Sequence, residues 1–415
     1  IDTLDNRNKQ LSSPIAMSYS IHQLNNKFNR SDNDLKTMKV VYATISSSFK
    51  GPLETSDFQH LEMQHYEDYT ASTQFFYLTA ENGDIVSVVE IVPRQGLHQG
   101  TLNLLLTMVF TNPDYRRRGL VAKLINWVIN FYETGTTDFD GAIKLADCFE
   151  MDQCREYISL ILPEEIVKSE KIHWTLYSIV GEYYARFGFN PCNDTEWIEL
   201  CADNFDIDFE LKEDTEKLLT MDNIPTYFTA QKYNLPHIED ERFNNCALEE
   251  ATFPGFVQRY QSYLNLNGLK EEFSEHGKYC GFLISGELDA SQKTIAFICP
   301  FFFMNRIVIP RVYTNVRDKN IFKHHWERIS KFAAWYAKQV WATIPNLSDY
   351  GDADKVLMVT SSDFVSETLT RQEFADVITS TGGWENRGQG IVLPMIRDWK
   401  LSRKPPSRLA HSGYW

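Results

Sequence analysis

The sequence predicts a mixed α/β protein in which a central sheet is flanked by helices, followed by a second unit of related but degenerate pattern. Apolar runs typical of strands alternate with amphipathic helical patterns through the first 200 residues. The same alternation returns after about residue 250. The chain has 415 residues, 43% of them hydrophobic, which is enough apolar material for two or three cores.

The elements of the first unit follow one another in a clear order. Asp32 is a good N-cap for a helix, Asn82–Gly83 is the dipeptide of a tight hairpin, and Gly135 is a typical helix end. The run 101–110 (TLNLLLTMVF) is continuously apolar, as in a strand that is buried on both faces. We expect, in order, a strand (18–24), two helices (32–49 and 55–69), the hairpin around Asn82–Gly83, a strand (101–110), a helix to Gly135, a strand (170–180), a short helix closed by Gly188, and a strand (197–201).

An internal repeat links the two halves. Residues 105–112 (LLTMVFTN) are matched by 308–315 (VIPRVYTN), and each segment precedes a charged loop and a helix with an aromatic pair near its end. The register holds over about 25 residues, which favours a duplication over two unrelated strand–helix units. The glycine of the first copy is missing from the second. We therefore expect a leader or tail of uncertain origin (1–16), a first domain (17–200) and a second domain without that glycine loop (201–415).

Composition excludes several classes of partner. The net charge is −15 with a pI near 5.2, so the positive charge that nucleic acid or an anionic membrane requires is missing. The seven cysteines are scattered and form no CxxC pair, which predicts no metal site and a reducing, cytoplasmic location. No apolar run is long enough to span a bilayer.

The stretch 109–125 (VFTNPDYRRRGLVAKLI) has the composition of an anion site. A buried strand feeds a loop that opens a helix, where the first N–H groups lack intrahelical partners and the helix dipole is positive. Gly119 would let an anion approach the backbone, and Arg116, Arg117 and Arg118 add forked donors. The single glycine fits neither the Walker loop nor the dinucleotide fingerprint. An ordinary solvated basic turn is the alternative.

Two motifs resemble those of the GNAT superfamily of acetyl-coenzyme A dependent N-acetyltransferases. The stretch above resembles its pyrophosphate loop, R-x-x-G-x-G/A, and LYSIVGEYYARFGF (176–189) resembles its later segment. The resemblance implies the α/β (α+β) GNAT fold, a second GNAT-like domain, acetyl-CoA as co-substrate without a metal, and Tyr184 as the residue that protonates the departing thiolate. The cofactor-binding residues it implies are Val109, Phe110, Thr111, Arg116, Arg117, Arg118, Gly119, Leu120, Val121, Ala122 and Ser178, with backbone amides near Val109 and Phe110 holding the oxyanion.

Within this superfamily, the chain resembles the fungal lysine N6-acetyltransferase family. Three segments carry this resemblance: LYS-x-x-G-x-Y-Y-A (176–185), FKGPLETSDF (49–58) and a Trp-rich tail. It implies a small amine acceptor, free L-lysine in the first place. A protonated ε-amine must lose a proton before it attacks, and Glu90, a carboxylate in an apolar strand, is the candidate base. The alternative is that Glu90 forms an ion pair with Arg94. His173 is a second candidate base, although a single histidine in a strand more often has a structural role.

Two other functions stay open. One is acetylation of a protein or peptide, which needs an open groove. The other is a coenzyme-binding regulatory protein without turnover. It is favoured by Val121, which stands where Gly or Ala is usual, and by Ile179, which stands where an acidic residue is expected after LYS.

Overall fold

The computed structural model describes 18–25, 32–51, 53–68, 73–95, 101–135, 143–145, 164–191, 197–205, 208–220, 222–223, 275–287, 289–301, 306–309, 312–342, 357–361, 364–366, 369–382, 384–386 and 393–400. The expected leader (1–16) and most of residues 206–274 lie outside these residues. Within the described part of the chain, no helix combines the length and apolar character needed to cross a membrane.

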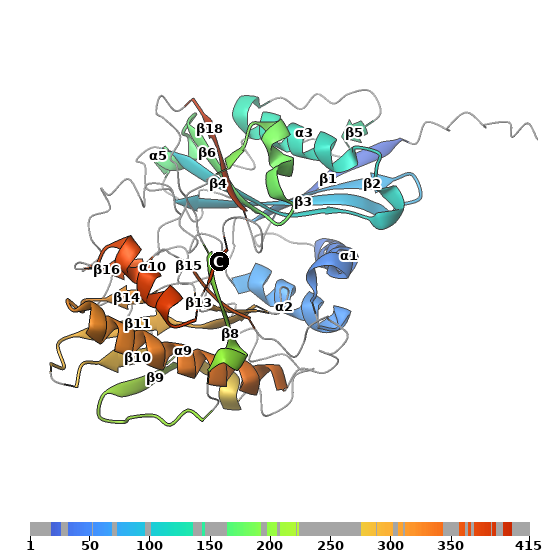
Figure 1. Ribbon diagram of the computed structural model, residues 1–415. Coiled ribbons are helices and arrows are strands. Elements are labelled where there is room, and N and C mark those ends of the chain that lie inside the picture. The colour runs from blue at the N-terminus through green and yellow to red at the C-terminus, as the bar shows by residue number, and fades with distance from the viewer. Residues whose placement is uncertain are drawn as a thin grey trace, which may run out of the picture.

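The first half is built on an eight-stranded sheet of order β5-β1-β2-β3-β4-β6-β18-β7. Figure 1 shows this sheet as the upper layer of the molecule. β4 is parallel to β6 and β1 is parallel to β5, whereas the other neighbouring strands are antiparallel. Its strands are β1 (Tyr19–Asn25), β2 (Gln74–Ala80), β3 (Ile85–Gln95), β4 (Leu102–Thr111), β5 (Ile143–Leu145), β6 (Ile172–Ser178), β7 (Asn190–Pro191) and β18 (Leu393–Trp399).

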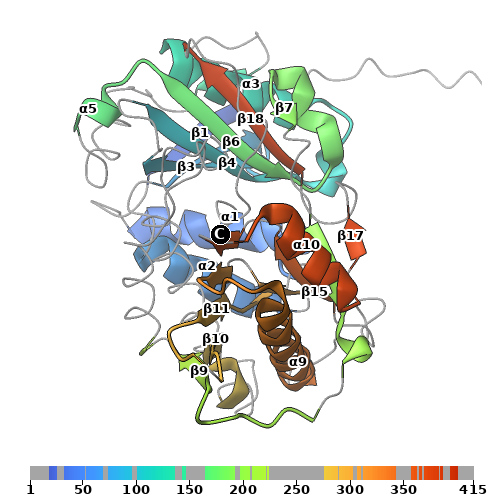
Figure 2. The same cartoon turned by 60° about the vertical axis from the view of Figure 1, so that its left-hand side comes forward.

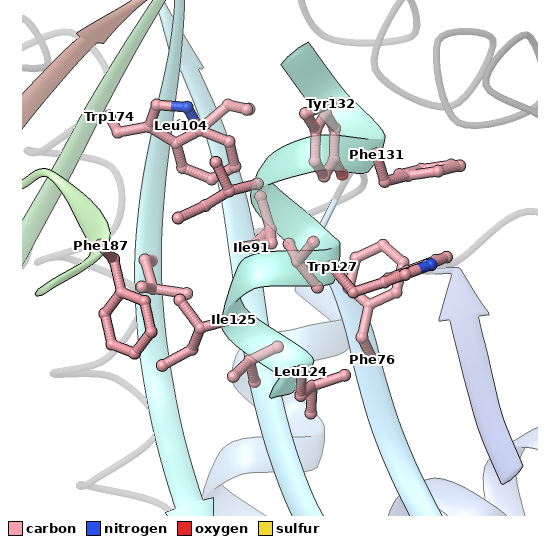
Figure 3. Close-up of a cluster of buried hydrophobic side chains, with 14 of the residues drawn as sticks. Phe76, Ile91, Leu104, Leu124, Ile125, Trp127, Phe131, Tyr132, Trp174 and Phe187 are labelled. Carbon is pink, nitrogen blue, oxygen red and sulfur yellow. The ribbon is translucent and has the colours of Figure 1, made fainter. Parts of the chain in front are cut away.

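Helices cover both faces of this sheet. α3 (Leu120–Thr134) packs on one face, where Leu124 and Val128 join a core cluster with Leu104 and Trp174. Figure 3 shows the aromatic part of this cluster, with side chains of α3 lying over the strands. α1 (Asp32–Phe49) packs on the opposite face, and α2 (Thr55–Asp68) lies against α1. The shorter helices that the structure describes in this half are η1 (Pro113–Tyr115), α5 (Glu164–Val167) and η2 (Gly181–Phe187).

Among its described residues, the second half has two five-stranded sheets and the helices α9 (Lys319–Ala342) and α10 (Arg371–Ser380). Leu53 and Leu61 belong to its core cluster, so α2 joins the two halves (Figures 1 and 2). Its other elements are β8 (Trp197–Cys201), η3 (Ala202–Asn204), β9 (Glu216–Thr220), β10 (Tyr279–Ser285), β11 (Lys293–Phe297), β12 (Cys299–Phe301), β13 (Arg306–Ile309), β14 (Val312–Thr314), β15 (Leu357–Ser361), β16 (Phe364–Ser366) and β17 (Trp384–Asn386).

The two halves have related topology. In the first, β4 leads through α3 to β6, which is parallel to β4. In the second, β13 and β14 lead through α9 to β15, which is parallel to β13. The second copy of the repeat, 308–315, is shared between two sheets, because β13 pairs with β15 and β14 pairs with β11. The mixed α/β fold with a second, degenerate unit is confirmed.

Each half contributes a strand to the sheet of the other. β8 follows β7 in the chain but lies in a sheet of the second half, antiparallel to β15. β18, near the end of the chain, lies in the first sheet between β6 and β7. Figures 1 and 2 both show β18 in red beside the green β6, in the upper layer. The predicted boundary at 200/201 falls inside β8.

Candidate active site

The parallel strands β4 and β6 separate part of the way along the sheet. Their pairing runs from Leu102↔Ile172 to Leu105↔Thr175 and stops there. β4 nevertheless continues to Thr111 and β6 to Ser178. From Leu106 onward, β4 is hydrogen-bonded to β3 on one side only among the described residues. In the described part of the chain, this edge of β4 has no second strand beside it, and an extended amide-containing chain can pair with it.

A bulge in β4 lies along this edge. Val88 faces Phe110 and Glu90 faces Thr107, so Met108 and Val109 together oppose one residue of β3. Met108 has a φ of 46°, which is unusual for a residue other than glycine. Past the bulge, Asn112 donates its N–H to Val86 O (3.0 Å), so the N–H of Phe110 also faces β3 and that of Thr111 faces the open edge. The side chain of Phe110 is buried on the α1 side.

The N-terminus of α3 opens beside the same edge. Its N-cap is Gly119, with φ 71° and no side-chain capping hydrogen bond. A Cβ at Gly119 would meet no atom within 4 Å, so the backbone there is open to an approaching group. Leu120 is buried in the core, and Val121 and Ala122 are half-buried against the same cluster. The amides of the first turn thus lack a partner from their own cap, as an anion site requires.

The three arginines differ in how they are held, although all three are exposed. Arg116 Nε donates to Thr111 O (3.2 Å). Arg118 donates to Asp114 O (3.3 Å) and to the Tyr19 hydroxyl (3.4 Å). Arg117 has a φ of 65°, and no ion pair ties its guanidinium to another described residue. The three arginines therefore place positive charge just before Gly119, and the Arg117 guanidinium is the least constrained of the three.

Polar contacts fix the loop that carries these arginines. The Asn112 side chain accepts from the Asp114 N–H (3.1 Å) and caps η1. Tyr115, itself buried, donates its hydroxyl to Asp84 in the β2–β3 turn (2.9 Å), and this hydrogen bond raises the pKa of Tyr115. The loop is therefore preorganised by the hairpin turn at Asn82–Gly83.

Tyr184 lies in η2, directly after β6. Its ring is buried in the cluster that also contacts Val109, Val121 and Ala122. It packs against Phe187 and Phe189, each with a centroid separation of 6.3 Å. Burial, with a smaller contribution from Tyr183, raises the pKa of Tyr184 well above its usual value near 10. The phenol is therefore protonated throughout the physiological range.

Ser178 ties the β6–η2 turn together. Its hydroxyl donates to Gly181 O (2.6 Å) and accepts from the Val180 N–H (3.2 Å). Because the side chain is buried and engaged, any contact of Ser178 with a cofactor would be made by its backbone. Ile179 and Val180, the next residues, are 50% and 58% exposed. They form a small apolar surface at the mouth of the opening between β4 and β6.

The two candidate bases lie on the sheet face that α1 covers. Glu90 is only 8% exposed and faces Thr107, about 7 Å along the strand from Val109. His173 faces Asn103, roughly 20 Å along the strand from Val109, and its Nδ1 pairs with the Asp398 carboxylate. The structure thus brings Glu90, and not His173, close to the bulge. The Arg94 side chain lies outside the described residues.

The corresponding helix start in the second half is closed. Asp318 precedes α9 and its carboxylate accepts from the N–H groups of Asn320 (2.7 Å) and Ile321 (3.4 Å). These amides are satisfied by the chain itself, and the carboxylate adds negative charge where a phosphate would bind. No group of three or more His, Cys, Asp or Glu residues that could hold a metal is present in the described part of the chain.

The residues that fix η2 from outside were not predicted from the sequence. Arg397 of β18 pairs with Glu133 of α3, and Gly188, with a φ of 81°, lies against the guanidinium. The apolar run that contains β18 (391–399) could have indicated a strand. Nothing in it indicated which sheet the strand joins.

The class of the protein follows from this geometry and from one family model. Residues 39–145 match the acetyltransferase (GNAT) family. The match covers the β4 bulge, the arginine loop and α3, and ends before β6 and η2. The chain therefore contains a GNAT acetyltransferase domain and is an acyltransferase.

Similar solved structures span most of the chain at low identity. One is a probable N-acyltransferase from Enterococcus faecalis V583 (11% identity, 92% of this chain and 73% of that one, TM-score 0.45). Another is a tandem GNAT protein from the clavulanic acid biosynthesis pathway (10%, 92% and 100%, TM-score 0.39). A third is N-myristoyltransferase of Saccharomyces cerevisiae with bound myristoyl-CoA (9%, 95% and 83%, TM-score 0.43). No curated protein matches the sequence.

Proposed function

We propose that the chain transfers the acetyl group of acetyl-CoA directly to the side-chain amine of free L-lysine or a related small amine. One observation carries the proposal: the open edge of β4 lies beside the N-terminus of α3, whose cap at Gly119 leaves the first amides without a side-chain partner. The amides of the pantetheine arm can hydrogen-bond to a free strand edge, and the pyrophosphate of coenzyme A can bind the free amides at a helix start.

The proposed cofactor site extends from α3 to β4. The pyrophosphate lies at Gly119 and the first turn of α3. Arg117, whose guanidinium is the least constrained of the three arginines, binds it. The pantetheine pairs with the edge of β4 that includes the Thr111 amide. The acetyl carbonyl lies at the bulge, where the backbone at Val109 holds the oxyanion. Ile179 and Val180 offer apolar contact to the coenzyme at the mouth.

The transfer itself needs three events at this site. The neutral amine attacks the acetyl carbon, the negative charge on oxygen is held by backbone N–H groups, and the carbon–sulfur bond breaks. The amine loses its proton to Glu90 directly or through water, since this carboxylate lies near the bulge on the neighbouring strand. A carboxylate at that place also favours a cationic acceptor such as lysine before it is deprotonated.

Tyr184 acts on the leaving group in this proposal. Its raised pKa keeps the proton on the phenol but makes complete transfer to a thiolate unfavourable, because the conjugate thiol has a pKa of about 8.5. The phenol therefore donates a hydrogen bond to the sulfur as charge develops there. The thiolate then leaves and takes its proton from solvent, so no step requires a phenolate.

The lysine acceptor rests on the resemblance of the motifs at 49–58 and 176–185 to the fungal lysine N6-acetyltransferase family. The test is incubation of the full chain with acetyl-CoA and, separately, L-lysine, a blocked lysine peptide, and no acceptor. Thiol release and the mass of the product are measured, and fragmentation locates the acetyl group.

Acetyl on the ε-amine of free lysine, with Tyr184→Phe slower by about 100-fold, supports the proposal. Acetylation of the peptide alone would instead establish a protein-directed enzyme. Binding of acetyl-CoA without release of thiol under any acceptor would contradict turnover altogether.

A further inference from the structure

The strand β18 reaches the first sheet from the far end of the chain. It pairs antiparallel with β6 along seven residues and with β7 on its other side, at Met395↔Pro191. The strands it joins flank η2, which runs from Gly181 to Phe187. The second half of the chain thus supplies the strand that lies beside the segment carrying Tyr184 (Figure 2).

Arg397 of this strand binds two elements at once. Its Nε and Nη2 donate to the two carboxylate oxygens of Glu133 at the end of α3 (3.0 and 2.7 Å). Its Nη1 donates to Phe187 O at the end of η2 (3.1 Å). The Glu133 side chain is 2% exposed and also accepts from Trp174 Nε1 (3.0 Å). A forked guanidinium is the side chain that can satisfy a buried carboxylate and still reach a carbonyl.

The turn after η2 is shaped to receive this guanidinium. Gly188 adopts φ 81°, and a Cβ there would lie 2.3 Å from Arg397 Nη1. Its N–H closes the turn on Ala185 O (2.9 Å). Tyr184 packs between Phe187 and Phe189, the residues on either side of this glycine. The position of the Tyr184 ring therefore depends on a turn that Arg397 holds.

We propose that Arg397 is a positioning residue for Tyr184, so that the second half of the chain orients the leaving-group residue of the first. The inference rests on the proposed function, in which Tyr184 donates to the departing sulfur. Arg397 touches neither acetyl-CoA nor the acceptor. It acts through Phe187 and Gly188, and its loss leaves the cofactor loop at Gly119 intact.

The test is a double-mutant cycle of Arg397→Lys and Tyr184→Phe. Lysine retains a positive charge beside Glu133 but lacks the fork that reaches Phe187 O as well. We expect Arg397→Lys to lower kcat about 10-fold and to change KM for acetyl-CoA less than about threefold. In the Tyr184→Phe background the same substitution lowers kcat no further, because the residue it positions is already disabled. Equal losses in both backgrounds would overturn the proposal.

Lys400→Gln is the matched control. Lys400 follows the same strand and pairs with Glu170 (2.8 Å), and both side chains are well exposed. The preceding residue, Trp399, pairs with Ile172, at the end of β6 that is opposite to η2. This variant is expected to keep the wild-type kcat and the wild-type unfolding transition. If Arg397→Lys and Lys400→Gln have the same effect on kcat, general weakening of β18 explains it and the positioning role is wrong.

A second measurement separates this inference from the proposed function. Hydrogen–deuterium exchange of peptides covering 181–189 reports the η2 turn without any turnover. We expect exchange there to be faster in Arg397→Lys than in wild type and Lys400→Gln. If no acceptor supports thiol release in wild type, the proposed function fails, and faster exchange still establishes that Arg397 holds the turn. Unchanged exchange would refute it.

Discussion

Gly119 and Gly135, at the two ends of α3, allow a controlled test of the cofactor site. Gly119 is the N-cap with φ 71° and ψ 13°, and Gly135 is the C-cap with φ 71° and ψ 11°. A Cβ at either position would meet no atom within 4 Å. Substitution by alanine therefore imposes the same backbone strain at both ends, about 1 kcal/mol, and creates no steric clash at either.

The two variants are expected to differ only in their binding of acetyl-CoA. A methyl group at 119 stands where the pyrophosphate approaches the first-turn amides, and one hydrogen bond to a charged group is worth about 1.5–3 kcal/mol. At about 1.4 kcal/mol per tenfold change, Gly119→Ala should raise the Kd for CoA by about 10- to 100-fold. Gly135→Ala, at the opposite helix end, should leave this Kd unchanged.

The assay combines calorimetric titration with CoA and urea unfolding of both variants. Matching losses of unfolding free energy together with a rise in Kd confined to Gly119→Ala would support the site. A pyrophosphate site at Gly119 would be refuted if CoA bound both variants equally, or if Gly135→Ala weakened binding as much as Gly119→Ala.

Three further predictions concern other parts of the molecule. The amine-dependent rate should rise with pH as the acceptor amine loses its proton. Because burial raises the pKa of Tyr184, ionisation of this phenol should cause no decline in the rate below about pH 10. A decline in that range that disappears in Tyr184→Phe would contradict this expectation. Burial lowers the pKa of His325 to about 4 from 6.5, so the folded state binds this proton less readily than the unfolded state. The contribution of the neutral side chain to the free energy of unfolding, about 3 kcal/mol, is therefore fully present above pH 6.5 and is lost as the pH falls toward 4. His325→Gln should flatten the acid branch of a plot of urea-unfolding free energy against pH, and an unchanged slope would disprove the linkage. Gly188→Ala should destabilise the chain by at least about 1 kcal/mol more than Gly135→Ala in the same urea experiment, since its Cβ meets the Arg397 guanidinium, and equal losses would show that the guanidinium moves freely.

The sequence predicted most elements of the first half because local signals determined them. Helical periodicity placed α1 and α3, the Asn82–Gly83 dipeptide placed the hairpin, and glycines ended α3 and η2 at Gly135 and Gly188. Each of these signals acts within a few residues of the backbone it describes. The order of the arginine loop and η2 was also readable, since both motifs are continuous in sequence.

The partners of β8 and β18 could not be predicted in this way. A strand pattern does not specify its neighbour, and β18 pairs with β6 at a separation of more than 200 residues. The contact of Arg397 with Glu133 follows only from that pairing. The direction of the amides around Met108 likewise depends on a bulge, and a bulge has no reliable signal in an apolar run such as 101–110.

The position of β18 in the first sheet also has a consequence for biosynthesis. The chain emerges from the ribosome N-terminus first, and β7 ends at Pro191 whereas β18 begins at Leu393. At ~5–20 residues per second, synthesis of the roughly 200 residues between them takes ~10–40 s. Throughout that interval the first sheet has a gap between β6 and β7, and the buried Glu133 has no guanidinium beside it. The first sheet can therefore be completed only after the strands β8 to β17 of the second half have been synthesised.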